Sequence, residues 1–578
     1  MTGPAAPKDP EKARPFFYIL KDKDIFGERQ KDGTGIQFIY ESDGRLINSA
    51  QITGNVTDKE ELTLLETVEG FGRLVHSIGV SVETDRPKET AEFVFQMYGK
   101  KDLYGGGTNL TTSLKCDGME HRIYLSDYRW TEDDHVPGQI KILFAAPERM
   151  GKVSVRLFLN DGYEAPPEEE DLFIDMHSEE YCGMISRSLL QLGNPYRIRK
   201  AIEKSKAGKE VTLAYIGGSI TQGAGAIPIH TECYAYKSFQ LFQNRFSTQN
   251  NVRFIKAGVG GTPSELGMIR FDRDVLREGE RPDIVVIEFA VNDEGDETKG
   301  VCYESLVRKV LKLPWKPAVV LLFSVFANDW NLQERLRPVG DLYDLPMVSI
   351  RDAVTPQFSL KCGEGRILSK NQFFYDIFHP NNTGHTIMAD CLQYLFERCD
   401  AAEPARVGTF VEGMTEEQIL SEKLSGPAVI GADFERIFLL DKKNRYVGAK
   451  IRAGGFTSTD MELQSVEMDG NLTQTPEFPY NWMYDGSRLQ MPGFEMEITC
   501  KSLFLIFKDS GEMDVGKANV FVNDVYCMTA DPHKNNWLHC NAVLLFWETE
   551  SRSHKVRIAV TEEDRNKKFT ILGFGYTI

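Results

Sequence analysis

Four short stretches of the chain hold residue types that together could carry out nucleophilic hydrolysis. The first is YIGGSITQGAGA, in which Ser219 follows an apolar run and stands among glycines. Glycines permit a tight turn from a strand into a helix, and such a turn exposes a serine hydroxyl. The stretch does not fit the dinucleotide fingerprint GxGxxG, and it lacks the Gly-Lys-Ser/Thr of a phosphate-binding loop. Taken alone, Ser219 is either a nucleophile or part of a plain tight turn.

The second and third stretches could stabilise a developing negative charge. In KAGVGGTPSEL, Gly260 and Gly261 would let a backbone N–H point into a cleft, although an ordinary strand–helix loop is the simpler interpretation of that stretch alone. In EFAVNDEGD, Asn292 ends an apolar strand. Its amide can donate to an oxyanion without carrying a titrating charge. A helix cap or turn residue is the alternative for Asn292.

The fourth stretch, FFYDIFHPNNTGH, offers a general base. Asp376 lies three positions before His379, so a turn can bring its carboxylate against one imidazole nitrogen. The other nitrogen is then free to face Ser219, as a nucleophile–base–orienter triad requires. His385 falls at the start of the next predicted helix, where we expect a packing or surface histidine.

The elements around these stretches predict an α/β domain over residues 184–402. Five apolar runs, VTLAYIGG, VRFIKAGVGG, DIVVIEFAVND, PAVVLLFSVF and PMVSIRDAV, alternate with helix-compatible segments. Continuous apolarity is typical of parallel strands buried on both faces, so we expect a three-layer α/β/α domain of roughly flavodoxin-like form. Each of the four stretches lies at or just beyond the carboxyl end of a predicted strand, where open α/β sheets bind ligands. The combination predicts a hydrolase.

With these four stretches, residues 184–402 resemble the SGNH (GDSL-like) hydrolases. Gly218 stands where the name-giving motif has Asp, and related carbohydrate esterases share this feature, so the departure favours them over lipases. The arrangement of the chain also resembles multi-domain carbohydrate O-acetylesterases. The resemblance implies that no metal and no organic cofactor is needed.

The resemblance also implies a role for each matching residue. The catalytic residues would be the nucleophile Ser219, the base His379 and its orienting partner Asp376. The oxyanion hole would consist of the backbone N–H groups of Ser219 and Gly261 and the side chain of Asn292.

The flanking regions are predicted to be β domains. Residues 15–180 hold short β-branched and aromatic runs without a strong helical period, which indicates an N-terminal antiparallel sandwich or jelly roll. The acidic segment DGYEAPPEEEDLF is a candidate linker. Residues 405–578 hold one predicted helix, TEEQILSEKL, and then short strands, so we expect a second β-sandwich there, with carbohydrate binding as a hypothesis for it.

Aromatic residues suggest where a sugar could bind. In FPYNWMYDG, Tyr480 and Trp482 are the candidates for substrate binding, with aromatic neighbours at alternate positions. They would either stack on sugar faces or form one face of a strand packed into the core. Trp130 and Trp537 are weaker candidates of the same kind.

The composition of the chain limits the classes of partner that it could bind and the compartment in which we expect it. The formal net charge is −18 and the pI is about 5.2, so nucleic acid and anionic membranes would repel the chain. No apolar stretch approaches the ~18 residues of a membrane span. The N-terminus lacks the apolar run of an export signal, so we expect a cytoplasmic protein. The ten cysteines show no metal-binding spacing, and a homo-oligomer is compatible with the sequence.

The predicted substrate is an O-acetylated plant-type poly- or oligosaccharide, such as xylan or mannan. A lipase would need an apolar lid, and no amphipathic helix offers one. An esterase or thioesterase for longer acyl chains is the alternative. A non-catalytic carbohydrate-binding protein is a remote one, because the set of candidate catalytic residues is intact.

Overall fold

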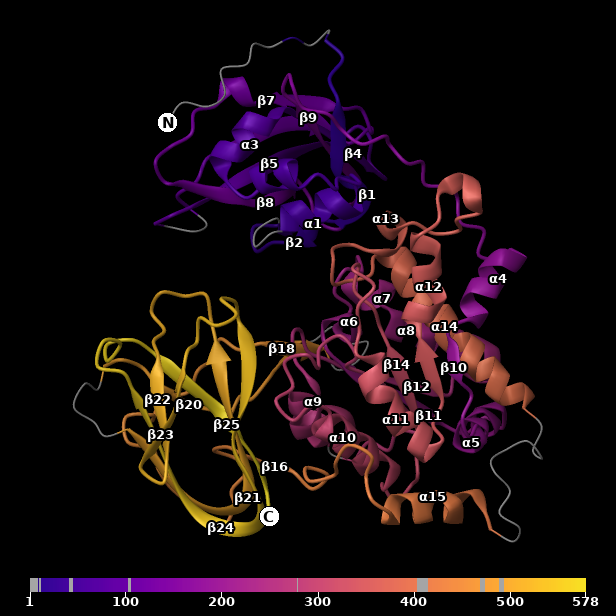
Figure 1. Cartoon of the computed structure of the whole chain (residues 1–578), viewed down its shortest axis with the longest axis vertical. Helices are drawn as coiled ribbons and strands as arrows, with labels where there is room; N and C mark the ends of the chain where they lie inside the picture. Colours follow the sequence, from indigo (N-terminus) through magenta and orange to yellow (C-terminus); the bar gives the residue numbers. More distant parts are fainter. Residues whose placement is uncertain are drawn as a thin grey trace.

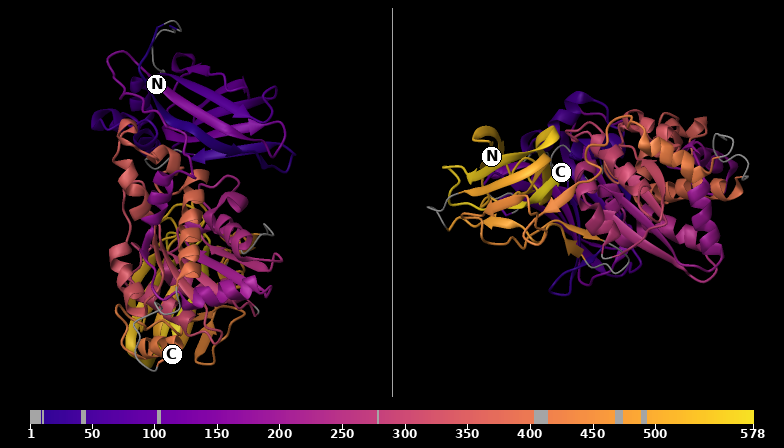
Figure 2. Two further views of the ribbon diagram at one scale, coloured as in Figure 1. Left: turned by 90° about the vertical axis from the view of Figure 1, so that its right-hand side faces the viewer. Right: turned by 90° about the horizontal axis from the view of Figure 1, so that it is seen from below.

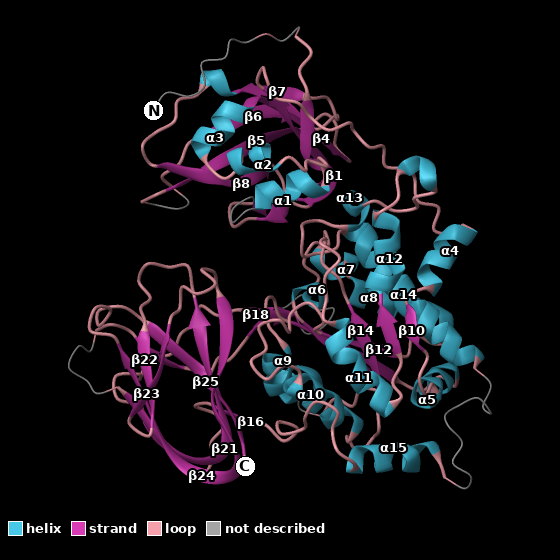
Figure 3. Cartoon of the chain, viewed as in Figure 1, coloured by secondary structure: helices cyan, strands magenta, loops and turns pink. Residues whose placement is uncertain are grey.

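The computed structural model describes residues 9, 12–40, 45–101, 105–277, 279–402, 414–467, 474–487 and 493–578. Figure 1 shows three units: an N-terminal and a C-terminal unit made mainly of strands, and a central unit with a sheet between helices. Figure 3 makes the contrast in secondary structure plain. The left view in Figure 2 shows the N-terminal unit at one end of the molecule.

The central unit is built on an eight-stranded sheet of order β10-β15-β14-β13-β11-β12-β18-β19. Strands β11 to β15 are mutually parallel and arise from the five apolar runs of the sequence. Their residues are almost all buried because helices cover both faces of the sheet. The parallel strands and the antiparallel edge strand β10 are β10 (Leu189–Gln191), β11 (Val211–Gly217), β12 (Val252–Gly258), β13 (Ile284–Glu288), β14 (Ala318–Phe323) and β15 (Met347–Ser349).

Two hydrophobic clusters fill the space between this sheet and its helices. Helices α4, α5, α8, α12 and α14 contribute to one cluster, and α9, α10 and α11 contribute to the other. The expected three-layer α/β/α arrangement is therefore confirmed. The helices are α4 (Glu179–Ser186), α5 (Tyr196–Lys206), α6 (Ser219–Gln222), α7 (Ile229–Glu232), α8 (Tyr234–Phe246), α9 (Ser264–Phe271), α10 (Val301–Leu311), α11 (Gln333–Tyr343), α12 (Ile350–Phe358), α13 (Lys370–Phe373), α14 (Asn382–Ala401) and α15 (Glu416–Ser425).

The N-terminal unit is a sandwich of two antiparallel sheets. One sheet has the order β1-β9-β4-β7 and the other β2-β3-β8-β5-β6, and a single apolar cluster lies between them. The strands are β1 (Phe16–Phe26), β2 (Glu28–Arg29), β3 (Gly35–Tyr40), β4 (Val75–Thr84), β5 (Thr90–Gly99), β6 (Asn109–Lys115), β7 (His121–Tyr124), β8 (Asp134–Phe144) and β9 (Met150–Leu159).

Three short helices in this unit were not predicted. They are α1 (Arg45–Ile52), α2 (Lys59–Leu64) and α3 (Val68–Leu74). Each has six to eight residues, too few to show a helical period in the sequence. Side-chain caps start two of them: Asp58 accepts the N–H groups of Glu60 and Glu61, and Thr67 accepts that of Gly70.

In the C-terminal unit a curved sheet surrounds one aromatic-rich cluster. The sheet has the order β16-β25-β21-β24-β22-β23, and β17 and β20 pair beside it. Long strands β21 and β24 bend across the unit (Figure 1), and their pairing shifts register near Cys500. The strands are β16 (Phe438–Leu440), β17 (Ala449–Arg452), β20 (Trp482–Tyr484), β21 (Phe494–Asp509), β22 (Ala518–Val522), β23 (Val525–Ala530), β24 (His539–Val560) and β25 (Phe569–Thr577).

The sheet of the central unit is completed by chain from far downstream. Strand β18 (Ser465–Glu467) pairs antiparallel with the end of β12, and β19 (Gln474–Pro476) pairs with β18. These two strands could not be predicted from the sequence, because three residues are too few to show the alternating hydrophobicity of a strand. The part of the sequence that forms the C-terminal unit is therefore also hydrogen-bonded to the edge of the central sheet.

Among the described residues, no helix combines the length and the apolarity that a membrane crossing requires.

Candidate active site

Ser219 stands at the junction between β11 and α6. The strand ends at Gly217, Gly218 precedes the helix, and Ser219 is the first helical residue. A side chain at position 218 would overlap the amide of Asn292, so only glycine lets these two segments approach so closely. Ser219 is partly exposed, whereas its neighbours on either side are buried. The turn thus presents the hydroxyl at the carboxyl edge of the sheet.

His379 and Asp376 come from the loop before α14 and meet Ser219 in a line. The Ser219 Oγ lies 3.0 Å from His379 Nε2, and His379 Nδ1 lies 2.9 Å from an oxygen of Asp376. The other oxygen of Asp376 accepts the backbone N–H groups of Phe378 and His379, each at 2.8 Å. These two bonds fix the carboxylate within its own loop, so the imidazole is held in one orientation.

The surroundings of Asp376 keep it ionised. Burial opposes its charge, but the neighbouring His379 and the bonds from that ring and from the N–H of Phe378 outweigh it and hold the pKa of Asp376 below its usual value. An ionised Asp376 accepts a hydrogen bond from the N–H at Nδ1 of His379. The lone pair on Nε2 is then left facing the hydroxyl of Ser219.

Besides the N–H of Ser219, the candidate oxyanion donors follow β12 and β13, the two strands that pair with β11. Asn292 follows β13 in a turn in which its N–H bonds to the carbonyl of Phe289, and its side chain lies against Gly218. Gly261 follows β12 and has a φ of +68°, in the region that favours glycine. A Cβ at position 261 would also come within about 3 Å of Trp537 and His539.

Arg270 was not singled out in the sequence. It is fully buried in α9, and its guanidinium donates to the carbonyls of Gly217 and Ala257 at 2.8 and 2.7 Å. Asp274 balances its charge at 3.0 Å. Arg270 therefore ties together the ends of β11 and β12, from which the Ser219 and Gly261 turns leave the sheet.

A buried polar network lies beneath Ser219. Thr221 donates to Glu288 at 3.1 Å and lies 2.8 Å from the hydroxyl of Tyr234. Burial raises the pKa of Glu288 to about 7, although the hydrogen bond from Thr221 opposes the shift. This network holds the first turn of α6 from below.

His385, for which the sequence allowed either a packing or a surface role, is buried and packs in the core. Its Nδ1 accepts the N–H of Tyr234 at 3.1 Å, and its Nε2 lies 3.1 Å from the carbonyl of Ala224. Burial lowers the pKa of His385 to about 3, so the ring is neutral. Asn382 bonds to both the N–H and the carbonyl of Ile227. Helix α14 therefore fixes the loop that follows Ser219 as well as carrying the His379 loop.

The candidate sugar-binding aromatics divide into two groups. Trp482 is only 5% exposed and packs on Phe494 and Phe574, and Trp130 is buried in the N-terminal core. Packing thus accounts for Trp482, and it offers no face to a sugar. Tyr480 is 44% exposed, but the ammonium of Lys443 already lies over its ring.

Trp537, in contrast, is 45% exposed and adjoins Gly261. Phe378, next to His379 in the chain, is also exposed, and its ring lies against those of His379 and Phe326. Two candidate site residues, Gly261 and His379, therefore each have an exposed aromatic ring beside them, and the ring beside Gly261 comes from the C-terminal unit.

One group of side chains has the composition of a metal site. Glu265, Asp296 and Cys302 are buried with their ligand atoms within 4.8 Å of one another. The oxygens of Asp296 are already used by Thr298 and the N–H of Gly300. Burial and the charge of Asp296 raise the pKa of Glu265 to about 10, so Glu265 holds a proton. Hydrogen bonds within the protein therefore already engage Asp296 in this cluster.

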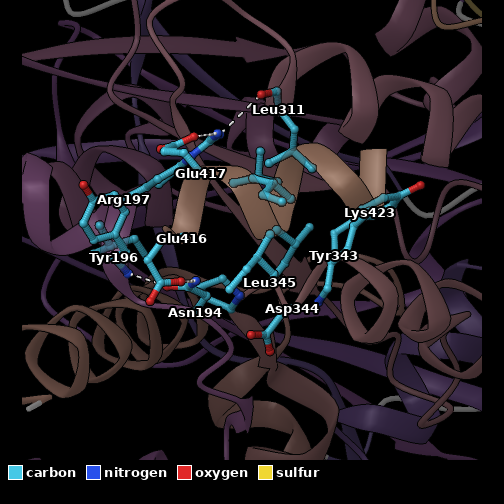
Figure 4. Close-up of a pocket in the computed structure, with 16 residues that line it drawn as sticks. Asn194, Tyr196, Arg197, Leu311, Tyr343, Asp344, Leu345, Glu416, Glu417 and Lys423 are labelled. Atoms are coloured by element: carbon cyan, nitrogen blue, oxygen red, sulfur yellow. Dashed lines mark hydrogen bonds and ion pairs between the residues drawn. The ribbon is translucent and has the colours of Figure 1, made fainter. Parts of the chain in front are cut away.

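The pocket in Figure 4 lies away from the triad. It is lined by residues of α5, α11 and α15 and by Ala318, the first residue of β14. Because β14 begins there, the pocket is at the amino edge of the sheet, opposite to Ser219. Its polar lining is internally paired: Arg197 binds Glu417 at 2.8 Å, and Asn194 binds Glu416.

Comparisons with known proteins agree with this geometry. Residues 215–387 match the model of the GDSL-like Lipase/Acylhydrolase family, and this segment contains all the candidate catalytic residues. No curated protein matches the chain. The expected resemblance to the SGNH (GDSL-like) hydrolases is thus confirmed for the central unit.

Among solved structures, the chain is similar to a two-domain esterase (CEX) active on acetylated mannans. The two share 23% identity with a TM-score of 0.54, over 68% of this chain and 98% of the esterase. The same esterase co-crystallized with mannopentaose gives 24% identity and a TM-score of 0.53 over the same shares. At this level of identity the likeness establishes a shared fold.

Proposed function

We propose that this protein is a serine esterase that removes O-acetyl groups from poly- or oligosaccharides such as mannan or xylan. The observation that carries the proposal is the hydrogen-bonded line from Ser219 through His379 to Asp376, with contacts of 3.0 and 2.9 Å. Such a line activates a hydroxyl for attack on an ester.

In the first half of the reaction, Ser219 Oγ attacks the acetyl carbonyl while its proton passes to His379 Nε2. Asp376 stabilises the imidazolium that forms. The negative oxygen of the tetrahedral intermediate is bound by the N–H groups of Ser219 and Gly261 and by the side-chain amide of Asn292. The intermediate collapses, and the sugar hydroxyl leaves with the proton from His379. Acetate now esterifies Ser219.

In the second half, water attacks the acetyl-enzyme. His379 takes a proton from the water, and the same donors stabilise the second tetrahedral intermediate. Its collapse releases acetic acid and returns the proton to Ser219. Both halves use only side chains and backbone groups of this chain, so the proposal requires no metal or organic cofactor.

A carbohydrate substrate is favoured by the surface around Ser219. Trp537 is exposed beside Gly261 and Phe378 is exposed beside His379, and aromatic rings can bind the apolar faces of sugars. The similar two-domain esterase is active on acetylated mannans, which makes mannan the first polysaccharide to test.

The test is acetate release from acetylated mannan and xylan oligosaccharides, beside 4-nitrophenyl esters of C2 to C8 acids. We expect fast release of acetate, preference for C2, and no activity in Ser219→Ala. Ser425→Ala, which changes an exposed serine on α15, is the matched control and should remain fully active. Activity that survives in Ser219→Ala would overturn the mechanism. Best turnover on C8 would move the enzyme to the esterases or thioesterases of longer acyl chains.

A further inference from the structure

The turn that carries Gly261 is hydrogen-bonded to side chains of a later part of the sequence, the part that also forms the C-terminal unit. Gln464, just before β18, donates from Nε2 to the carbonyl of Gly260 at 2.8 Å. His539, the first residue of β24, lies with Nε2 3.1 Å from the carbonyl of Gly261. Both side chains are nearly buried, at 9% and 5% exposure. Two successive carbonyls of one short turn are therefore bonded across the unit boundary.

The first of these bonds determines where the N–H of Gly261 points. The carbonyl of Gly260 and the N–H of Gly261 belong to one planar trans peptide group, so they point in opposite directions. Fixing the carbonyl on Gln464 therefore fixes the N–H on the other side. The bond from His539 fixes the next peptide group in the same way. Because glycine has unusually free φ and ψ angles, a Gly-Gly turn without such bonds would have many orientations.

Both holding side chains are themselves rigid. Gln464 Oε1 accepts the N–H of Cys540 at 3.0 Å. His539 Nδ1 accepts from the amide of Asn535 at 3.0 Å, so the proton of the ring is on Nε2, where it donates to Gly261. Burial lowers the pKa of His539 to about 4, which keeps this tautomer neutral near pH 7. The two donors are thus pre-organised.

We propose that Gln464 and His539 are positioning residues that aim the backbone N–H of Gly261 at the oxyanion. This inference rests on the proposed esterase function and deepens it: the region beyond the central unit completes the oxyanion hole as well as offering Trp537 to the substrate. Neither residue touches the substrate. Each acts through the peptide groups of the Gly260–Gly261 turn.

The first test compares Gln464→Met with wild type on 4-nitrophenyl acetate, a substrate that makes no sugar contacts. Loss of a whole oxyanion donor costs about 10²–10³ in kcat, and a misdirected donor should cost about 10–10². We expect that loss with KM changed less than about twofold and with the same loss on an acetylated oligosaccharide, since the defect is in the transition state. Met461→Ala, at an exposed position three residues earlier, should retain wild-type kcat.

The outcomes separate the two proposals. A wild type that hydrolyses no ester would refute the esterase function and this inference with it. An active wild type together with a Gln464→Met variant of unchanged kcat would refute the inference alone.

The second test guards against a variant that folds poorly. His539→Phe removes the donor to Gly261, whereas His539→Gln supplies an amide that can donate again. We expect kcat to fall about 10-fold in the first and to recover at least in part in the second, at matched thermal midpoints. If the two variants had the same kcat, or if kcat simply followed the thermal midpoint, the positioning role would be wrong.

Discussion

Replacing Asp376 by Asn separates the electrostatic role of this residue from its structural one. One oxygen of Asp376 accepts from the N–H groups of Phe378 and His379, and the amide oxygen of Asn can keep both bonds. The other oxygen, 2.9 Å from His379 Nδ1, would become an NH₂ group. Two donors would then face each other, so the imidazole must adopt the tautomer with its proton on Nε2. That tautomer cannot accept the proton of Ser219.

The expected loss is large and confined to catalysis. The same change in the serine protease triad costs about 10⁴ in kcat, which corresponds to about 5 kcal/mol of transition-state stabilisation. We therefore expect a fall of that order in kcat on 4-nitrophenyl acetate, with a thermal midpoint close to that of wild type. Asp329→Asn, at an exposed acid paired with Lys370, is the control and should keep full activity. A kcat of Asp376→Asn within tenfold of wild type would refute the assignment of Asp376 as orienter.

Three further outcomes follow from the contacts around the site. Lys23 of β1 is buried and donates to the carbonyls of Asn371 and Phe374, so Lys23→Met should lower both the thermal midpoint and kcat. An unchanged kcat would show that the loop with Asp376 and His379 needs no such support. Trp537→Ala should raise KM for an acetylated oligosaccharide about 3- to 10-fold, and an equal effect on 4-nitrophenyl acetate would contradict sugar stacking. His385 has a pKa of about 3 in the folded protein, so as the pH is lowered the unfolded chain binds a proton at this ring before the folded protein does. The free energy of unfolding should therefore fall as the pH is lowered from 6.5 to 3, by at most about 1.4 kcal/mol per pH unit. His385→Gln should remove this part of the slope in urea titrations at several pH values, and an unchanged slope would contradict the neutral ring.

Much of the central unit was predictable because its signals are local. Each of the five apolar runs forms a buried parallel strand, and the ends of those strands are where Ser219, Gly261 and Asn292 stand. Asp376 and His379 are three positions apart, so one turn was enough to predict their contact. The order of the strands then brings these turns to one edge of the sheet without any information from the flanking units.

What escaped prediction depends on contacts distant in sequence. Gln464 meets Gly260 across 204 residues, and Lys23 meets Phe374 across 351. Arg270 was not predicted because its partners are backbone carbonyls, which no sequence pattern reveals. Trp482 was preferred to Trp537 as a sugar ligand in the sequence, and burial reverses that order.

Contacts between residues far apart in sequence support two parts of the candidate site: the loop with Asp376 and His379, and the turn with Gly261. Lys23, from the N-terminal unit, bonds to carbonyls of the segment that leads into Asp376 and His379. Gln464 and His539, from chain beyond the central unit, bond to the carbonyls of the Gly261 turn. A loop that carries a catalytic group needs an orientation precise to a fraction of an ångström, and a loop at the edge of a sheet has few neighbours within its own unit to provide it. The flanking units supply those neighbours, one to the His379 loop and the other to the Gly261 turn, so we expect their packing to affect the rate of the chemical step.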